Sequence, residues 1–179
     1  MIVSVIGAGG HVGLPFSLVC AKAGHKVYGI DRNQELLNII SNGEVPYIEY
    51  GAMEILHEQL DNGNIEFTVN PSYIKDSDVV AIMLGTPVDE ENNPRLNDLF
   101  NFVDYTLIPF MKKGTLVLLR STVAPGTTER VRDRIFDKSG WIEGQDYHLV
   151  FCPERVLQTR SIEETQTLPQ LIGAFGEIS

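Results

Sequence analysis

Several features are scarce in this sequence of 179 residues, and each scarcity excludes a class of protein. There is no run of about 18 apolar residues, so we expect no membrane-spanning helix. No basic segment followed by a short apolar one stands at the N-terminus, so we expect no signal peptide. Cys20 and Cys152 are the only cysteines, too few for a disulfide framework. A reducing cytoplasm is therefore the expected location.

Positive charge is also scarce, with 14 Lys and Arg against 24 Asp and Glu and a formal net charge of −10. No cluster of basic residues is present, so we expect neither nucleic acid nor an anionic membrane as a partner. Any anionic ligand must be held locally, by backbone amides or a few arginines. The four histidines lack the spacing of metal ligands, so no metal site is expected. They are His11, His25, His57 and His148.

What is present is an alternation of apolar runs and helical patterns. The runs predict strands at residues 2–6, 25–31, 64–68, 78–84, 115–121, 147–151 and 170–175. The patterns predict helices at residues 12–23, 34–42, 52–61, 97–111 and 127–137. Continuous Val, Ile and Leu runs are typical of parallel strands buried on both faces. The sequence thus predicts one α/β domain over residues 1–179, a Rossmann-type, doubly wound, mainly parallel sheet with helices on both faces.

The first predicted turn, "GAGGHVG", is a candidate dinucleotide-binding turn with unusual spacing. The usual pattern is G-x-G-x-x-G, in which the pyrophosphate lies at the start of the helix. Gly7, Gly9 and Gly13 fit this pattern except for one extra residue between Gly9 and Gly13. Gly10 and Gly13 have the usual spacing, but an alanine then stands in place of the first glycine. His11 and Val12 complete the candidate turn. Glycine-rich turns between a strand and a helix also occur without any ligand.

Asp31 ends the second predicted strand, 18 residues after Gly13. An acid there accepts hydrogen bonds from the adenosine ribose and repels a 2′-phosphate, which favours NAD over NADP. Arg32 is adjacent and could blur this preference, and Asp31 alone could be an ordinary turn residue. The glycine turn and the acid together predict a dinucleotide cofactor.

Six blocks of the sequence, in order, resemble one known family. They are "HVGLP", "NGEVPYIEYG", "GTPVDEENNPRLNDL", "STVAPGTT", "FCPERVL" and "LPQLIGA". Together the blocks extend over the whole chain. They are similar to the N-terminal domain of the UDP-glucose/GDP-mannose dehydrogenase family, in particular its UDP-N-acetylmannosamine dehydrogenase-like branch.

The resemblance implies a nucleotide-sugar 6-dehydrogenase that converts the C6 hydroxyl of a UDP-sugar to a carboxylate with two NAD. The sugar would be of the UDP-glucose or UDP-N-acetylhexosamine type. In this family a cysteine thiolate captures the intermediate aldehyde, and the resulting thioester is hydrolysed. The nicotinamide supplies the redox chemistry while the protein supplies orientation.

The resemblance also assigns roles to residues at the strand ends. Glu154 matches the glutamate that handles water or a proton during thioester hydrolysis, a role that suits a carboxylate whose pKa is raised. Thr122 matches a residue beside the nicotinamide and the catalytic water. Without the resemblance, Glu154 could be a helix-start acid and Thr122 a turn residue. The further cofactor-binding candidates are Thr86, Pro87 and Ser121, and Asp98 also matches the family pattern.

The resemblance also implies what lies outside the chain. The family nucleophile lies much further along, so Cys152 is expected to be a buried strand-end residue, and Cys20 a core residue of the first helix. Where the family branch has Pro-Gly after "ERVL", this sequence has Gln158 and Thr159. We expect the chain to bind NAD without turnover, and the full-length protein to be a homodimer. Two alternatives stay open, a stand-alone NAD-binding regulatory module and a dehydrogenase of the 6-phosphogluconate or 3-hydroxyacyl-CoA type.

Overall fold

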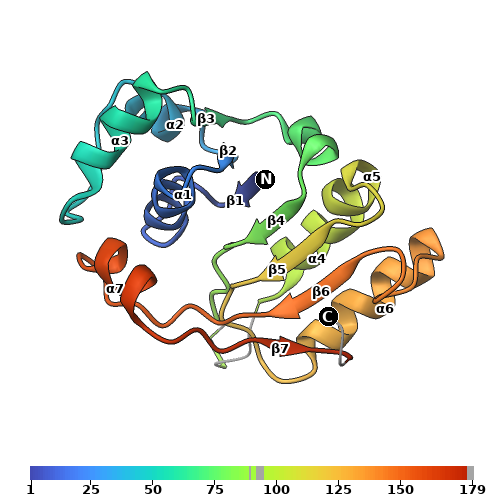
Figure 1. Ribbon diagram of the computed structural model, residues 1–179. Coiled ribbons are helices and arrows are strands. Elements are labelled where there is room, and N and C mark those ends of the chain that lie inside the picture. The colour runs from blue at the N-terminus through green and yellow to red at the C-terminus, as the bar shows by residue number, and fades with distance from the viewer. Residues whose placement is uncertain (89, 92–94, 177–179) are drawn as a thin grey trace.

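A computed structural model describes residues 1–88, 90–91 and 95–176, which form a seven-stranded sheet in the order β3-β2-β1-β4-β5-β6-β7 (Figure 1). The first six strands are parallel, and β7 alone is antiparallel to its neighbour β6. This order confirms the predicted doubly wound sheet. The strands are β1 (Ile2–Ile6), β2 (Lys26–Ile30), β3 (Ile65–Thr68), β4 (Val79–Ile82), β5 (Leu116–Leu119), β6 (His148–Phe151) and β7 (Gly173–Ala174).

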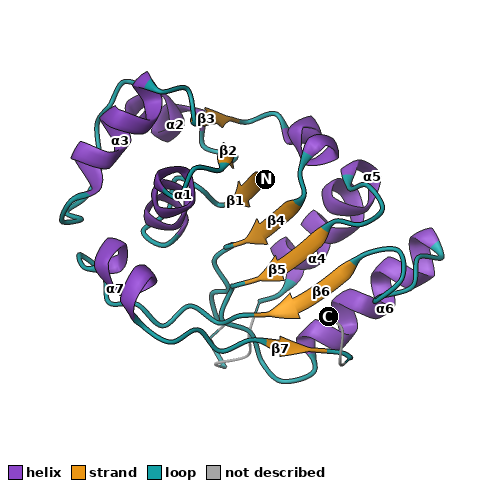
Figure 2. Cartoon of the chain, in the orientation of Figure 1, coloured by secondary structure: helices purple, strands orange, loops and turns teal. Residues whose placement is uncertain are grey.

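Helices cover both faces of the sheet, as predicted (Figure 2). One apolar core packs between the sheet and α1, α2 and α3, and α7 lies beside α1. The other core lies beneath α4, η2, α5 and α6. The helices are α1 (Gly13–Lys22), α2 (Gln34–Ser41), α3 (Ala52–Asp61), α4 (Asn97–Phe102), α5 (Ile108–Phe110), α6 (Thr127–Ser139), α7 (Ser161–Thr167), the 3₁₀ helix η1 (Pro71–Asp76) and the π-helix η2 (Val103–Leu107).

Local chemistry sets several helix ends. The Asn33 side chain accepts a hydrogen bond from the Leu36 amide at 3.1 Å and so caps the start of α2. Gly140, at φ +72°, ends α6 in the left-handed conformation that glycine adopts readily. The predicted helix boundaries lie within two residues of the observed ones at α2 and α6.

Three differences from the sequence prediction have physical causes. The helix expected at residues 97–111 is observed as α4, η2 and α5, because Pro109 lacks an amide and its ring widens the preceding turn. The helices η1 and α7 were not predicted. Asn70, whose side chain caps η1 just before Pro71, was an available signal, whereas α7 is too polar to show an apolar period. The strand expected at residues 170–175 is only the two-residue β7.

Within the part of the chain that the structure describes, no helix combines the length and the apolar character needed to span a membrane. The same residues contain no group of three or more His, Cys, Asp or Glu side chains arranged to hold a metal ion.

Candidate dinucleotide site

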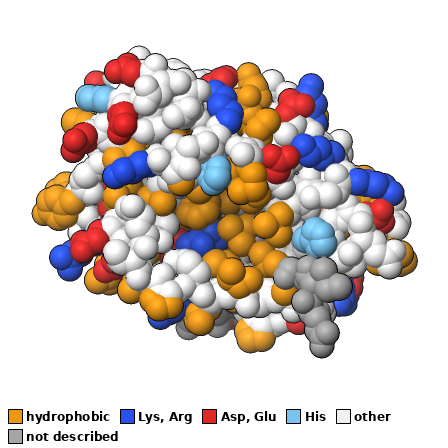
Figure 3. Space-filling view, in the orientation of Figure 1, with side chains coloured by type: hydrophobic (Ala, Val, Ile, Leu, Met, Phe, Trp, Pro, Cys, Tyr) orange, Lys and Arg blue, Asp and Glu red, His pale blue; other side chains and the backbone are white. Residues whose placement is uncertain are grey.

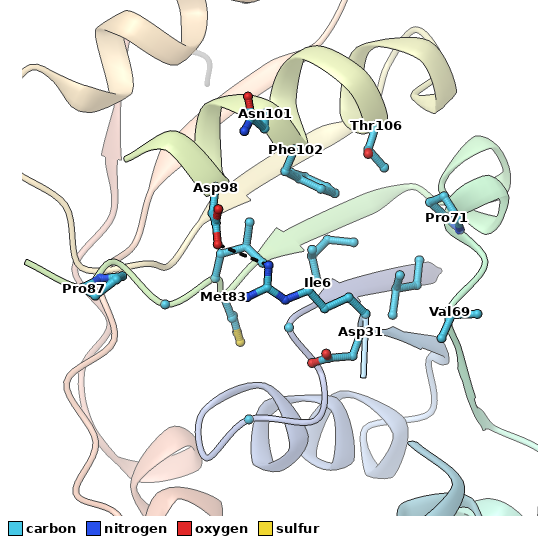
Figure 4. Close-up of a pocket in the computed structure, with 16 residues that line it drawn as sticks. Ile6, Asp31, Val69, Pro71, Met83, Pro87, Asp98, Asn101, Phe102 and Thr106 are labelled. Atoms are coloured by element: carbon cyan, nitrogen blue, oxygen red, sulfur yellow. Dashed lines mark hydrogen bonds and ion pairs between the residues drawn. The ribbon is translucent and has the colours of Figure 1, made fainter. Parts of the chain in front are cut away.

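A cleft of about 710 Å³ opens at the carboxyl ends of β1, β2 and β4 (Figure 4). It lies where the strand order reverses between β1 and β4, the place where open α/β sheets bind ligands. Asp31 lies on one side, and Asp98, Phe102 and Thr106 project from the helix on the other. The space-filling view shows apolar side chains gathered around a Lys or Arg side chain in the middle of one face of the molecule (Figure 3).

Two glycines of the turn are required by the space around them. Gly7 has φ +84°, and a Cβ there would lie 2.6 Å from the carbonyl oxygen of Met83, the residue that follows β4. A Cβ on Gly13 would overlap the carbonyl oxygen of Gly7, so Gly13 lets α1 pack tightly against the turn. The Gly7 amide donates to the Ile30 oxygen at 2.9 Å, which fixes the turn to the end of β2.

The middle glycine of the fingerprint is Gly10. A Cβ on Gly10 would meet only the Gly7 oxygen, at 3.4 Å, so this residue faces open space and lines the cleft. The extra residue is Gly9, whose amide donates to Asp31 Oδ2 at 3.0 Å and whose Cα packs against Leu36. The two close backbone approaches thus fall on Gly7 and Gly13, and Gly10 between them lines the cleft.

The start of α1 leaves amides free for an anion. Among the residues that the structure describes, no hydrogen-bond acceptor is found for the backbone N–H groups of His11, Val12 and Gly13. The N-cap Val12 makes no side-chain cap, and the first turn of α1 contains no acidic residue. Free amides at a helix N-terminus suit the pyrophosphate of a dinucleotide.

Asp31 stands at the end of β2 with its carboxylate held in place. Its Oδ2 accepts from the Gly9 amide, and its Oδ1 accepts from the Asn33 amide at 3.1 Å. Each oxygen retains a second acceptor position, which suits two ribose hydroxyls. Arg32 is turned toward the opposite wall, where its Nη1 lies 3.3 Å from Asp98 Oδ2. Both side chains are well exposed, so this ion pair adds little stability.

The remaining predicted residues lie outside this cleft, whose lining includes Gly7, Gly10, Asp31, Arg32 and Pro87. Those outside it are Gly9, His11, Val12, Gly13, Thr86, Ser121, Thr122 and Glu154. Thr86 Oγ1 donates to the Thr122 carbonyl at 2.5 Å and so joins the loops that follow β4 and β5. Part of the matched block "GTPVDEENNPRLNDL", namely Asp89 and residues 92–94, falls outside the described residues.

Arg120, at the end of β5, is a site residue that the sequence analysis missed. Only 3% of it is exposed, and its Nη2 lies 2.5 Å from Glu154 Oε2. Its Nη1 donates to Cys152 Sγ at 3.2 Å and to Gln170 Oε1 at 3.3 Å. The guanidinium also stacks 4.7 Å from the centre of the Phe16 ring. A charged residue at the end of an otherwise apolar strand, "TLVLLR", was the available signal.

Both carboxylate oxygens of Glu154 have hydrogen-bond partners. Its Oε2 pairs with Arg120, and its Oε1 accepts from the amides of Arg155 and Val156 at 2.8 and 3.2 Å. A carboxylate with a buried guanidinium and two amides has one fixed orientation. The structure thus holds Glu154 in a fixed position on the loop that follows β6, at the carboxyl end of the sheet.

The two cysteines are poor nucleophiles. Cys152 is 2% exposed, which confirms its predicted burial, and that burial raises the pKa of its thiol although Arg120 acts in the opposite direction. Burial raises the pKa of the Cys20 thiol to about 11, and this side chain is partly exposed rather than fully in the core. Since the thiolate is the reactive form, neither thiol is activated at neutral pH.

The loop after β6 is tied to the segment between α2 and α3. The buried carboxylate of Glu49 accepts from the Thr159 amide at 3.1 Å and from the Ile162 amide at 3.2 Å, at the start of α7. The Tyr50 amide donates to the Thr159 oxygen at 3.1 Å. Thr159 has φ +77°, and no other non-glycine residue in the described ranges has a positive φ. This is the position at which the sequence departs from the Pro-Gly of the family pattern.

Replacing Thr159 by glycine should stabilise the protein, because a β-branched residue is strained at this φ. We expect T159G to raise the free energy of unfolding by about 1 kcal/mol, after allowing for the greater entropy of glycine in the unfolded chain. Urea unfolding monitored by circular dichroism measures the change. T165G, inside α7, is the control and should lower the free energy of unfolding by about 1 kcal/mol. Equal effects of both substitutions would contradict the prediction.

The parallel sheet, the glycine turn and the acid at the end of β2 define a dinucleotide-binding domain of the Rossmann class. The chain belongs to the UDP-glucose/GDP-mannose dehydrogenase family, whose NAD-binding domain matches residues 1–177. NAD is accordingly the cofactor of this domain, and the open amides, the exposed face of Gly10 and the Asp31 carboxylate fit it.

Individual relatives agree with this assignment. The UDP-N-acetyl-D-mannosamine dehydrogenase of Methanococcus aeolicus is 30% identical over 179 residues, covering 99% of this chain and 39% of that protein. The solved structure of the corresponding enzyme from Pyrococcus horikoshii superimposes with a TM-score of 0.92 at 32% identity, over 97% of this chain and 41% of that one. A ternary complex of GDP-mannose dehydrogenase from Pseudomonas aeruginosa gives 0.91 at 27% identity, over 98% and 41%. The chain thus spans about two fifths of the length of these relatives.

Proposed function

We propose that this chain is the NAD-binding part of a nucleotide-sugar 6-dehydrogenase, which oxidises the C6 hydroxyl of a UDP-sugar to a carboxylate with two NAD. The substrate is of the UDP-glucose or UDP-N-acetylhexosamine type. The observation that carries the proposal is the cleft at the strand reversal, where Gly7, Gly10 and Asp31 lie together. Relatives named UDP-N-acetyl-D-mannosamine dehydrogenase support the choice of substrate class.

Each group of residues has a distinct task in this proposal. The amides of His11, Val12 and Gly13 hold the pyrophosphate, and Asp31 holds the adenosine ribose. Bound NAD supplies the hydride acceptor.

Thr122 and Glu154 lie on the loops after β5 and β6, at the carboxyl ends of the two strands that follow β4 in the sheet. Glu154 holds the water or proton used in thioester hydrolysis, in the orientation that Arg120 fixes. The nucleophilic cysteine of the family has no counterpart in this chain, because Cys20 and Cys152 are in other positions and are not activated. Residues 1–179 therefore act as a cofactor domain that binds NAD without turnover.

Calorimetric titration of the chain with NAD and then NADP tests the proposal. We expect NAD to bind at least about tenfold more tightly, because the Asp31 carboxylate repels the 2′-phosphate. D31N keeps one side-chain oxygen but removes the charge, so it should weaken NAD binding about tenfold and narrow the preference over NADP. D61N, at the exposed end of α3, is the matched control and should change neither affinity.

Three results would contradict the proposal. Equal affinity for NAD and NADP would show that Asp31 does not read the ribose, and no binding of either would remove the cofactor assignment. Formation of NADH when the chain is mixed with NAD and UDP-glucose or a UDP-N-acetylhexosamine would overturn the expectation of binding without turnover.

A further inference from the structure

We infer that Tyr47 is a positioning residue for the pyrophosphate of the dinucleotide, acting through the Gly10 peptide and the His11 ring. The inference rests on the proposed NAD-binding function and adds a residue from a different part of the chain. Tyr47 belongs to residues 44–51 between α2 and α3, here named the strap. It does not contact the cofactor itself in this inference.

The hydroxyl of Tyr47 donates to the Gly10 carbonyl oxygen at 2.8 Å. That oxygen also accepts from the Leu14 amide at 3.1 Å, in the first turn of α1. The Gly10 carbonyl is thus held by two donors, which fixes the peptide that joins Gly10 to His11. The amide on the other side of this peptide is that of His11, one of the three without an acceptor among the described residues.

The side chains of His11 and Tyr47 also contact each other. Their ring centres are 4.0 Å apart, with the planes tilted by 35°. A hydrogen bond on Gly10 and a ring contact on His11 hold two successive residues of the turn. Both act on the segment whose amides face the pyrophosphate, so they set the direction of those amides before any ligand arrives.

Tyr47 is well placed to keep this role at neutral pH. Burial, with a contribution from the nearby Glu49 carboxylate, raises the pKa of Tyr47 above its usual range, so that the hydroxyl stays protonated. A protonated phenol donates one hydrogen bond, and that bond goes to Gly10. The hydroxyl therefore supports the turn instead of contacting the phosphates as a donor.

The strap is fixed at its other end as well. The Glu49 carboxylate is buried against the amides of Thr159 and Ile162, and the Tyr50 amide donates to the Thr159 oxygen. These bonds anchor the strap two and three residues beyond Tyr47. The position of the Tyr47 ring is therefore set by contacts that are independent of the glycine turn.

Binding titrations with three ligands separate positioning from general stability. Y47F keeps the ring and removes only the hydrogen bond to Gly10. We expect it to weaken the binding of NAD and ADP-ribose by roughly three- to tenfold. Adenosine, measured as a competitor of NAD, has no pyrophosphate, so its inhibition constant should stay unchanged. Y50F, in the same strap but with its side chain 72% exposed, is the matched control and should alter none of the three.

Two results would overturn the role of Tyr47 while leaving the NAD-binding function intact. In the first, Y47F binds ADP-ribose as tightly as the unaltered chain does. In the second, Y47F binds ADP-ribose and adenosine more weakly by the same factor. H11A removes the ring contact and should show the same split between ADP-ribose and adenosine as Y47F. If the unaltered chain fails to bind NAD, both the proposed function and this inference fall.

Discussion

Gly13→Ala is expected to destabilise the protein by about 3 kcal/mol or more, whereas Gly10→Ala should leave the fold intact and abolish most NAD binding. The Cβ of an alanine at position 13 would overlap the backbone oxygen of Gly7, which cannot rotate away as a side chain does. At position 10 the same methyl meets only an ordinary contact of 3.4 Å. The two substitutions are chemically identical, so they form a matched pair.

The loss of NAD binding in G10A follows from the space that the methyl would fill. Gly10 lines the cleft, and in the proposed function the pyrophosphate lies close to its backbone. We expect an affinity at least about tenfold lower by calorimetry, with a free energy of unfolding within about 1 kcal/mol of the unaltered chain. G7A should resemble G13A, because Gly7 combines φ +84° with a close approach to Met83. A stable G13A, or a G10A that binds NAD normally, would show that the roles of these glycines have been wrongly assigned.

Arg120→Met is expected to lower the free energy of unfolding by about 3–5 kcal/mol. The side chains of Arg120 and Glu154 are 2% and 10% exposed, so removal of the guanidinium leaves a largely buried carboxylate without its cation. Methionine fills a similar volume, which keeps the effect electrostatic. Urea unfolding measures the loss.

A double-mutant cycle tests whether the effect belongs to the ion pair. R120M/E154Q removes both charges, so it should be more stable than R120M alone by about 1–3 kcal/mol. R160M is the control, because the Arg160 and Glu163 side chains are mostly exposed and 3.8 Å apart, and its effect should be below about 0.5 kcal/mol. If R120M and E154Q destabilise additively, the pair is not coupled and the interpretation is wrong.

The sheet and the location of the cleft were predictable because they depend on local patterns. Apolar runs such as Ile2–Ile6 mark buried strands, and Asp31 follows directly from the end of such a run. The alternation of strands and helices then predicts a doubly wound parallel sheet, whereas the order of its strands comes from the structure. In this chain the local pattern and the global fold agree over most of the sequence.

The details of the site depend on information that residue spacing does not contain. The number of residues between the glycines does not show that the Gly9 amide donates to Asp31. This hydrogen bond is how the turn accommodates its extra residue. Arg120 and Glu154 are 34 residues apart, and Glu49 and Thr159 are 110 apart, so neither pair leaves a local signature. The π-helix η2 lies just before Pro109 and depends both on the missing proline amide and on packing against the core. Helix propensity alone does not predict it.

Glu49 holds the loop after β6 through peptide groups alone, and this has a consequence for how the loop can change over time. Its partners are the amides of Thr159 and Ile162, which every residue except proline possesses. The side chains of Gln158 and Thr159 take no part in these bonds, so they can be exchanged without detaching the loop, unlike the buried side chain of Ile162. The departure from Pro-Gly at Gln158 and Thr159 is one such exchange. The attachment through Glu49 therefore tolerates this departure while the glycine turn and Asp31 stay unaltered.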